Sequence, residues 1–192
     1  MPEIVVKGVQ ITLAGLLTLR EINLVAADRS VTGILGPSGC GKSTLFNIIS
    51  GLMKPDKGSV FIGGGDVMGK TGLVSYMHQK DLLLPSLNVL DNVSIPLVLR
   101  GMPRKAARTE AARHLQTFGL QGFESYYPWQ LSGGMKQRAA MLRTYLFSSD
   151  TWLLDEPFAS LDAITKRKMH TWLTGVLEQF RPTVLFITHD VD

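Results

Sequence analysis

Alternating apolar and polar positions in the first part of the chain predict an antiparallel β region. Ile4–Leu13 and residues 21–27 alternate and are rich in β-branched side chains, as half-buried strands are. The apolar run Val31–Leu35 ends at a glycine and predicts a short strand. Residues 42–52 then carry apolar side chains at helical spacing, and residues 59–62 predict a further strand.

The pattern becomes mostly helical after a strand at residues 73–77, and strands return near the end. The predicted elements are helices at 104–118 and Gly133–Phe147, a strand at 152–154, a helix at 164–180 and a strand at Thr183–Thr188. This alternation is typical of an α/β fold with a mainly parallel sheet. We expect an α/β core with an antiparallel β subdomain over 1–81 and 149–192, and an inserted helical subdomain over 82–148.

Composition and charge narrow the class of protein only slightly. Of 192 residues, 45% are hydrophobic and 19% charged, which argues against disorder, and the net charge of +4 is too small for a dedicated nucleic-acid binder. The single cysteine, Cys40, excludes an internal disulfide and favours a reducing cytosol. No stretch reaches the roughly 18 uncharged apolar residues of a membrane span, so a transport role would need another chain for the pore.

Residues 36–43 match the glycine-rich pattern G-x-x-x-x-G-K-[ST] between a predicted strand and a predicted helix. Backbone N–H groups of such a loop converge on phosphate oxygens, and the helix N-terminus favours anions. Lys42 would reach the β- and γ-phosphates of ATP, and Ser43 would ligate Mg²⁺. The alternative is a glycine-rich turn with a chance lysine. The predicted nucleotide contacts are Gly36, Pro37, Ser38, Gly39, Cys40, Gly41, Lys42, Ser43 and Thr44.

Two acids, Asp155 and Glu156, stand where the apolar strand 152–154 stops. Ligands of open α/β sheets bind beyond the carboxyl ends of the strands. Neighbouring strand residues point to opposite sides, so the two acids have different roles. Asp155 is predicted to hold Mg²⁺ through water, and Glu156 to polarise the attacking water. Taken alone, the pair would indicate a solvated loop.

Residues 131–138 (Leu-Ser-Gly-Gly-Met-Lys-Gln-Arg) place a serine N-cap and two glycines at the start of a helix. This makes a second anion site with nothing local to bind, or simply a capped helix. The segment resembles the LSGGQ signature of ABC ATPases, with Met135 in the glutamine position. Gln79 is similar to the family's Q-loop glutamine, Asp162 to the D-loop aspartate and His189 to the switch histidine. These motifs stand in the family's order over nearly the whole chain.

The chain therefore resembles the ATP-binding subunits of ABC transporters, with a P-loop NTPase core. Residues 76–85 and 155–163 are similar to importer ATPases of the nitrate, sulfonate and taurine group, whose relatives carry small solutes. The resemblance implies a motor subunit that hydrolyses ATP at the interface of a head-to-tail dimer. The loop of one subunit would hold ATP, and the other subunit would close it with Ser132, Gly133, Gly134 and Asp162.

The resemblance also implies partners and further roles. His189 would contact the γ-phosphate, and Gln79 would join Ser43 and Asp155 at Mg²⁺ and link the nucleotide to the helical subdomain. Integral membrane permease subunits would dock near residues 79–87 on the cytoplasmic face of the cell membrane. A solute-binding protein would act indirectly, and no nucleic acid is expected.

The sequence departs from the family at two places. Leu13 stands where the family has an aromatic residue that stacks on adenine, so we expect weaker discrimination between ATP and other nucleoside triphosphates. The chain ends at Asp192, three residues after His189, whereas similar ATPases continue, so a C-terminal part is expected to be missing. The motor activity of the chain alone is therefore in question.

Two other functions stay open at this point. ABC ATPases of DNA repair or the ribosome carry coiled coils, zinc cysteines or a second cassette, none of which this sequence contains. A regulatory subunit that only binds nucleotide would not need the intact Lys42, Glu156 and His189. Trp129 and Trp172 are interpreted as packing residues. A basic run is interpreted as a solvated helix face, with anionic headgroups or an acidic loop as the alternative partner: Arg100, Arg104, Lys105, Arg108 and Arg113.

Overall fold

The structure is a computed structural model that describes residues 3–148 and 150–188. Its chain divides into two compact units, 1–76 with 150–156 and 181–192, and 77–149 with 157–180. The strands are β1 (Ile4–Leu13), β2 (Leu16–Ala26), β3 (Val31–Leu35), β4 (Lys57–Ile62), β5 (Gly65–Asp66), β6 (Ser75–Met77), β7 (Thr151–Asp155) and β8 (Thr183–Thr188). The helices are α1 (Lys42–Ile49), α2 (Val89–Leu99), α3 (Arg104–Ala112), the 3-10 helix η1 (Pro128–Gln130), α4 (Gly133–Phe147) and α5 (Ala163–Phe180).

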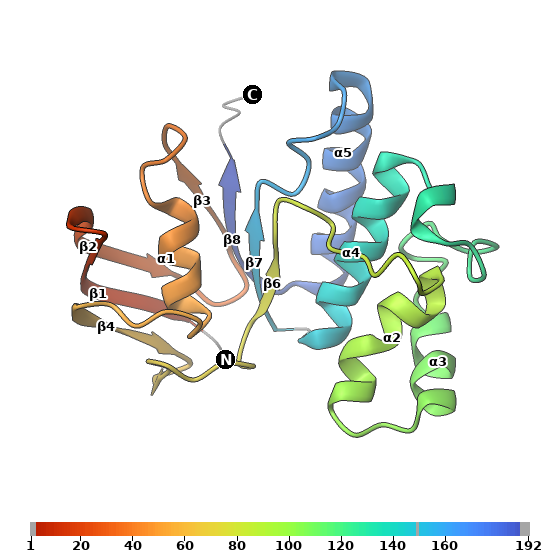
Figure 1. Cartoon of the computed structure of the whole chain (residues 1–192), viewed down its shortest axis with the longest axis horizontal. Coiled ribbons are helices and arrows are strands. Elements are labelled where there is room, and N and C mark those ends of the chain that lie inside the picture. Colours follow the sequence, from red (N-terminus) through yellow and green to blue (C-terminus); the bar gives the residue numbers. More distant parts are fainter. Residues whose placement is uncertain (1–2, 149, 189–192) are drawn as a thin grey trace. The chain divides into compact units, whose positions relative to one another are not determined.

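The first unit is built around α1, which lies between two sheets (Figure 1). Within the described residues, one sheet has the order β2-β1-β4-β5 with antiparallel pairs, and the other has the order β3-β8-β7-β6. The apolar side of α1, including the fully buried Phe46 and Ile48, shares one core with both sheets. The predicted α/β fold with an antiparallel β subdomain is confirmed.

The parallel sheet brings three strand ends to one edge. β3 and β7 each pair in parallel with β8, which lies between them. Leu35 pairs with Thr188, and Asp155 pairs with Ile187, so β3, β7 and β8 end at nearly the same level. The glycine-rich loop after β3 and the acidic pair of β7 therefore lie at the same edge of the sheet, on either side of β8.

The second unit is helical and includes α5. Phe118 packs against Trp172 and Phe180 of α5, with ring centroids 5.9 and 6.1 Å apart, and Tyr145 of α4 joins the same cluster. The sequence-based prediction includes α5 in the core. Alternation of helices and strands does not show which aromatic side chains a helix packs against. The predicted division at residues 82 and 148 stays a prediction.

The helix predicted at 104–118 is shorter in the structure, where α3 ends at Ala112. Beyond it, the N–H groups of Arg113, His114 and Leu115 bond to carbonyls three residues back rather than four. The apolar spacing continues through Phe118, but the backbone has tightened into turns. Across residues 3–148 and 150–188, no helix is long and apolar enough to cross a membrane.

Candidate functional site

The glycine-rich loop joins β3 to α1 and leaves the start of the helix without a side-chain cap. Gly39 and Gly41 have φ of 80° and 97°, in the left-handed region that favours glycine. A Cβ on Gly41 would lie 2.7 Å from Leu19 Cδ2 and 3.1 Å from the carbonyl oxygen of Thr18. Both conformation and space therefore require glycine here. The first N–H groups of α1 lack a side-chain acceptor, which suits an anion.

Lys42 is folded into the loop. Its Nζ donates to the carbonyl oxygens of Gly36 at 2.7 Å and Pro37 at 2.9 Å, and the residue is only 9% exposed. An ammonium group has three donors, and these neutral carbonyls are weaker partners than phosphate oxygens. The loop therefore holds a cation close to the uncapped start of α1. Ser43 is exposed beside it, as a hydroxyl that could reach a metal ion must be.

Asp155 lies at the end of β7 and is 7% exposed. The hydroxyl of Tyr76 donates to its Oδ2 at 3.2 Å, and the Tyr76 ring packs edge-on against Phe46 of α1. Burial, and then the charge of Asp155, raise the pKa of Tyr76 well above its usual value. The hydroxyl therefore stays protonated and remains a donor to the carboxylate at neutral pH.

Glu156 follows directly and has an unusual backbone conformation. Its φ is 45°, which a residue with a Cβ rarely adopts, and its N–H bonds to the Ile187 carbonyl oxygen at 3.0 Å. Glu156 thus keeps a backbone hydrogen bond to β8, although its own backbone leaves the strand conformation. Strain of this kind gathers at functional sites.

The residues expected at Mg²⁺ divide between the two units. Ser43 and Asp155 belong to the first unit, and Gln79 to the second, where it is exposed. Hydroxyl, carboxylate and amide oxygens are hard donors of the type that Mg²⁺ prefers, so the residue types fit this ion. His189 lies outside the described residues.

The signature segment opens α4 in the second unit. Ser132 is its N-cap and accepts a hydrogen bond from the Met135 N–H at 3.3 Å. Ser132 and Gly133 are exposed, and a Cβ on Gly133 would come within 3.0 Å of Leu161 Cδ2. Asp162 accepts from the Thr165 N–H at 3.0 Å at the start of α5, and hydrogen bonds from the Thr165 side chain and backbone lower the pKa of Asp162.

The segment that follows Gln79 is tied to α4 and α2. Arg143 of α4 donates to the carbonyl oxygens of Asp81 at 2.6 Å and Leu82 at 2.7 Å. Asn92 of α2 is fully buried and both accepts from and donates to the backbone of Leu84. The segment is therefore fixed to the helix that begins at the signature.

The β1–β2 hairpin carries the position expected to contact adenine. Leu13 is partly buried and packs against the core of the first unit, whereas Leu16 and Leu17 at the turn are 72% and 45% exposed. Ala14 and Gly15, with φ of 48° and 79°, form the turn between them. The hairpin tip thus presents aliphatic side chains and no ring.

Trp129 contradicts its interpretation as a packing residue, because it is 72% exposed. It stands in η1, and its ring stacks on that of Tyr127 with centroids 6.2 Å apart and an interplanar angle of 14°. Trp172, by contrast, packs between Phe118 and Arg138. The 3-10 turn directs Trp129 outward, which composition alone does not reveal.

The basic run is more than a solvated face. Arg104 and Arg108 both bond to Asp91 Oδ1, at 3.1 and 2.7 Å, and Arg113 bonds to Glu110. The guanidinium of Arg100 lies 5.2 Å from the centroid of the Phe147 ring. Several of these cations therefore have partners within the helical unit.

A phosphate loop at the end of a parallel strand, with an acid pair two strands away, defines a P-loop nucleotide-binding protein. The ABC transporter family matches residues 19–159, and the chain belongs to this family. It is an ABC transporter ATPase.

Two relatives have names that describe what they transport. The formylaminopyrimidine import ATP-binding protein ThiZ of Halalkalibacterium halodurans is 46% identical over 174 residues, which cover 91% of this chain and 68% of that protein. The taurine import ATP-binding protein TauB of Pseudomonas aeruginosa is 45% identical over 175 residues, covering 91% of this chain and 66% of that protein.

Solved structures agree with the fold. A dimeric bacterial ABC transporter cassette is 31% identical, with a TM-score of 0.83, over 98% of this chain and 88% of that one. The same cassette, in a dimeric post-hydrolysis state bound to ADP and Pi, is 30% identical with a TM-score of 0.83.

Tyr76 and Arg143 have contacts at the site that the sequence did not reveal. Tyr76 stands in a strand three residues before Gln79, and Arg143 lies in the middle of α4. Only the strand order, which brings β6 beside β7, identifies Tyr76 as a partner of Asp155. Arg143 has no local signal, because its acceptors are 61 and 62 residues away.

Proposed function

We propose that this chain drives uptake of a small organic solute through separate membrane subunits, using ATP with Mg²⁺. The import ATPases ThiZ and TauB, at 46% and 45% identity, support a solute of the formylaminopyrimidine or sulfonate type. The observation that carries the motor function is the common edge of the parallel sheet, where Lys42 and the acid pair of β7 flank the end of β8.

The residues at this edge divide the work of hydrolysis. Lys42 exchanges its loop carbonyls for phosphate oxygens and neutralises charge on the β- and γ-phosphates. Ser43 and Asp155 would hold Mg²⁺, which would supply charge stabilisation when bound, and Tyr76 orients the carboxylate. Glu156, turned by its left-handed φ, orients and polarises the attacking water.

The second subunit completes the site. Ser132, Gly133 and Gly134 form the exposed start of α4, whose N–H groups face the γ-phosphate held by the other subunit of a homodimer. Asp162 orders the turn before α5 at the same interface. The dimeric cassette of the family, at 31% identity, supports the formation of a dimer. ATP thereby closes the dimer, and hydrolysis allows it to open.

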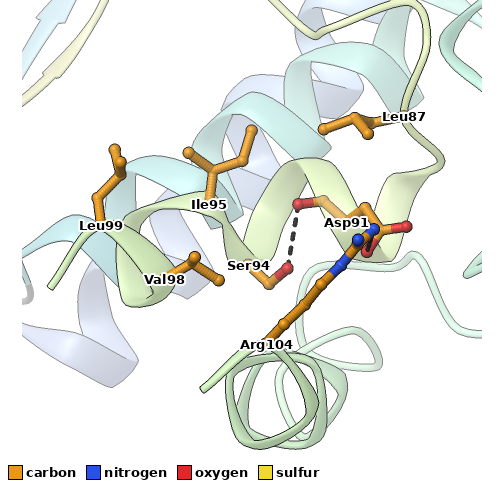
Figure 2. A pocket seen from close by; sticks show the side chains of 7 residues that line it. All are labelled: Leu87, Asp91, Ser94, Ile95, Val98, Leu99 and Arg104. Atoms are coloured by element: carbon orange, nitrogen blue, oxygen red, sulfur yellow. Dashed lines mark hydrogen bonds and ion pairs between the residues drawn. The ribbon is translucent and has the colours of Figure 1, made fainter. Parts of the chain in front are cut away.

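A groove in the helical unit is the surface proposed for the membrane subunits, on the cytoplasmic side of the membrane. Its volume is about 340 Å³. Figure 2 shows its lining residues on α2, on the segment before it and at the start of α3: Leu87, Asp91, Ser94, Ile95, Val98, Leu99 and Arg104. Leu99 is 78% exposed, and Leu82 and Leu84 of the nearby fixed segment are 53% and 47% exposed. The segment after Gln79 is bonded to Arg143 of α4. If a membrane subunit bound in the groove moves this segment, α4 moves with it.

The Glu156→Gln variant tests the motor function. It removes the negative charge that polarises water but keeps the size of the side chain. We expect ATP binding within about twofold of wild type, ATP-dependent dimers that persist, and turnover lower by about 10²–10⁴-fold. Size-exclusion chromatography with light scattering measures the dimer, and phosphate release measures turnover. Wild-type turnover by this variant would contradict the role of Glu156.

Isolation of the chain from a membrane fraction tests the transporter assignment. We expect integral membrane permease subunits to co-purify with it, and a solute-binding protein to bind only to that complex. Recovery with ribosomes or DNA in place of a permease would overturn the proposal.

A further inference from the structure

The second unit presents an exposed aromatic pair close to the signature. Trp129 is 72% exposed, and one face of its ring stacks on Tyr127, which is 39% exposed. A tryptophan ring offers a large apolar area, so a ligand that covers it gains affinity from the area removed from water. The flat, supported ring is the type of surface on which nucleic-acid bases stack.

The chain between Trp129 and the signature is short and extended. Leu131 has φ −96° and ψ 146°, and Ser132 has φ −66° and ψ 161°. The Cα atoms of Trp129 and Ser132 are therefore at most about 10 Å apart, since each extended residue spans about 3.3 Å. A ribose and two further phosphates separate adenine from the γ-phosphate, which is a span of the same order.

The hairpin that should stack on adenine within one subunit has no ring. Leu13 packs into its own core, and the large side chains exposed at the tip are those of Leu16 and Leu17. A base held by this subunit would touch aliphatic groups on one side at most. A second subunit can supply an aromatic surface for the base, and Trp129 is the most exposed aromatic residue in the described part of the chain.

We propose that Trp129 of one subunit stacks on the adenine of the ATP held by the partner subunit, so that base recognition occurs across the dimer. This rests on the proposed head-to-tail dimer. The signature of one subunit would cover the γ-phosphate while Trp129, three residues before Ser132, covers the base. A single subunit then binds nucleotides with little contribution from the base. The base adds to affinity only when the dimer closes, and a two-ring purine adds more than a one-ring pyrimidine because it covers more of the tryptophan ring.

The test measures nucleotide-driven dimerisation in the Glu156→Gln background, where ATP is not consumed. Light scattering gives the concentration of ATP, or of UTP, that produces half of the dimer. We expect Trp129→Ala to raise the ATP concentration about tenfold, to raise the UTP concentration about twofold at most, and to leave ATP binding to the monomer unchanged. Trp129→Phe keeps a ring and should stay within about threefold of the parent.

Tyr126→Ala is the matched control. Tyr126 has the same 39% exposure as Tyr127, but its ring packs against Phe123 rather than Trp129. We expect no change in either concentration. Equal losses for ATP and UTP in Trp129→Ala, or the same loss in Tyr126→Ala, would overturn the role in base stacking. Unchanged dimerisation of Trp129→Ala together with loss of permease binding would also overturn it, and would show that the two rings contact a membrane subunit.

The experiment also separates this inference from the proposed function. If the parent Glu156→Gln chain forms no dimer with ATP, the head-to-tail dimer is wrong and the stacking role falls with it. If the parent dimerises and Trp129→Ala requires the same ATP concentration, only the stacking role is wrong.

Discussion

Two helix N-termini of this molecule are proposed to face the phosphates of ATP, and they differ in structure. The start of α1 follows a left-handed glycine, lacks a side-chain cap and holds Lys42 within its loop. The start of α4 is capped by Ser132, which uses one N–H group, and stands exposed to solvent. The first contains a cation, Lys42, and lies at the edge of the sheet that also carries Asp155 and Glu156. The second begins with the exposed residues Ser132 and Gly133, and its own segment, residues 131–138, contains no acid.

We call the start of α1 with its loop the first half-site, and the start of α4 the second half-site. The difference between them explains why the sequence of the first predicts a nucleotide site by itself and the sequence of the second does not. A loop with its own lysine and strand-end acids can bind a nucleotide in a single subunit. A serine-capped helix with two glycines gains a function only when another molecule presents a phosphate to it. The variants below test this contrast.

Lys42→Ala should have the largest effect, because it removes the cation of the first half-site. Charge-assisted hydrogen bonds to phosphate contribute about 3 kcal/mol at most, so ATP affinity should fall by about 100-fold. Isothermal titration calorimetry measures it, and Lys57→Ala, an exposed cation on β4, is the control. A decrease of less than fivefold would show that the loop amides alone hold ATP.

Gly41→Ala should strain the same half-site through its backbone. A side chain at φ 97° costs about 1–2 kcal/mol, and the contact with Leu19 at 2.7 Å adds to it. We expect a loss of about 2–3 kcal/mol in the free energy of unfolding, measured with urea, together with lower ATP affinity. Gly15→Ala has φ 79° and open space, so it should lose about 1 kcal/mol. Equal losses in the free energy of unfolding for the two variants would show that the contact with Leu19 adds no cost.

Ser132→Ala tests the second half-site. Loss of the hydrogen bond from the Met135 N–H should cost about 1 kcal/mol of stability. ATP binding to the monomer should not change, whereas ATP-driven dimerisation should weaken. Thermal melts, calorimetry and light scattering separate these effects. Weaker ATP binding by the monomer would mean that the two helix starts serve one subunit.

Tyr76→Phe should have the smallest effect, since it removes one hydrogen bond to Asp155. Turnover should fall severalfold, and the Mg²⁺ concentration for half activity should rise. The raised pKa of Tyr76 means that the folded state holds its proton more tightly than the unfolded state. Wild type should therefore lose stability as pH rises above about 10, and the variant should lose less. Identical pH dependence of the two melting temperatures would contradict this.

Local sequence was sufficient for most of the first unit and for the start of α4. Glycines, a lysine and strand-end acids at short spacing predict their own backbone, so the loop and the strand carrying Asp155 could be placed from the sequence. The sequence also predicted the bounds of α4 correctly, because Ser132 and the glycines after it mark the start of a helix. Apolar spacing alone extended α3 too far, because it does not report where hydrogen bonds shift to three-residue turns.

The tertiary structure decided what depends on residues far apart in the chain. The sequence by itself determined the family, the phosphate loop, the acid pair and the missing ring at Leu13. Only the strand order brought Tyr76 to Asp155, and only packing showed that Arg143 holds the segment after Gln79 and that Trp129 points into solvent. Short-range motifs consist of neighbouring residues and can be identified from the sequence. Exposure and long-range hydrogen bonds arise only when separate elements pack, so no local sequence pattern predicts them.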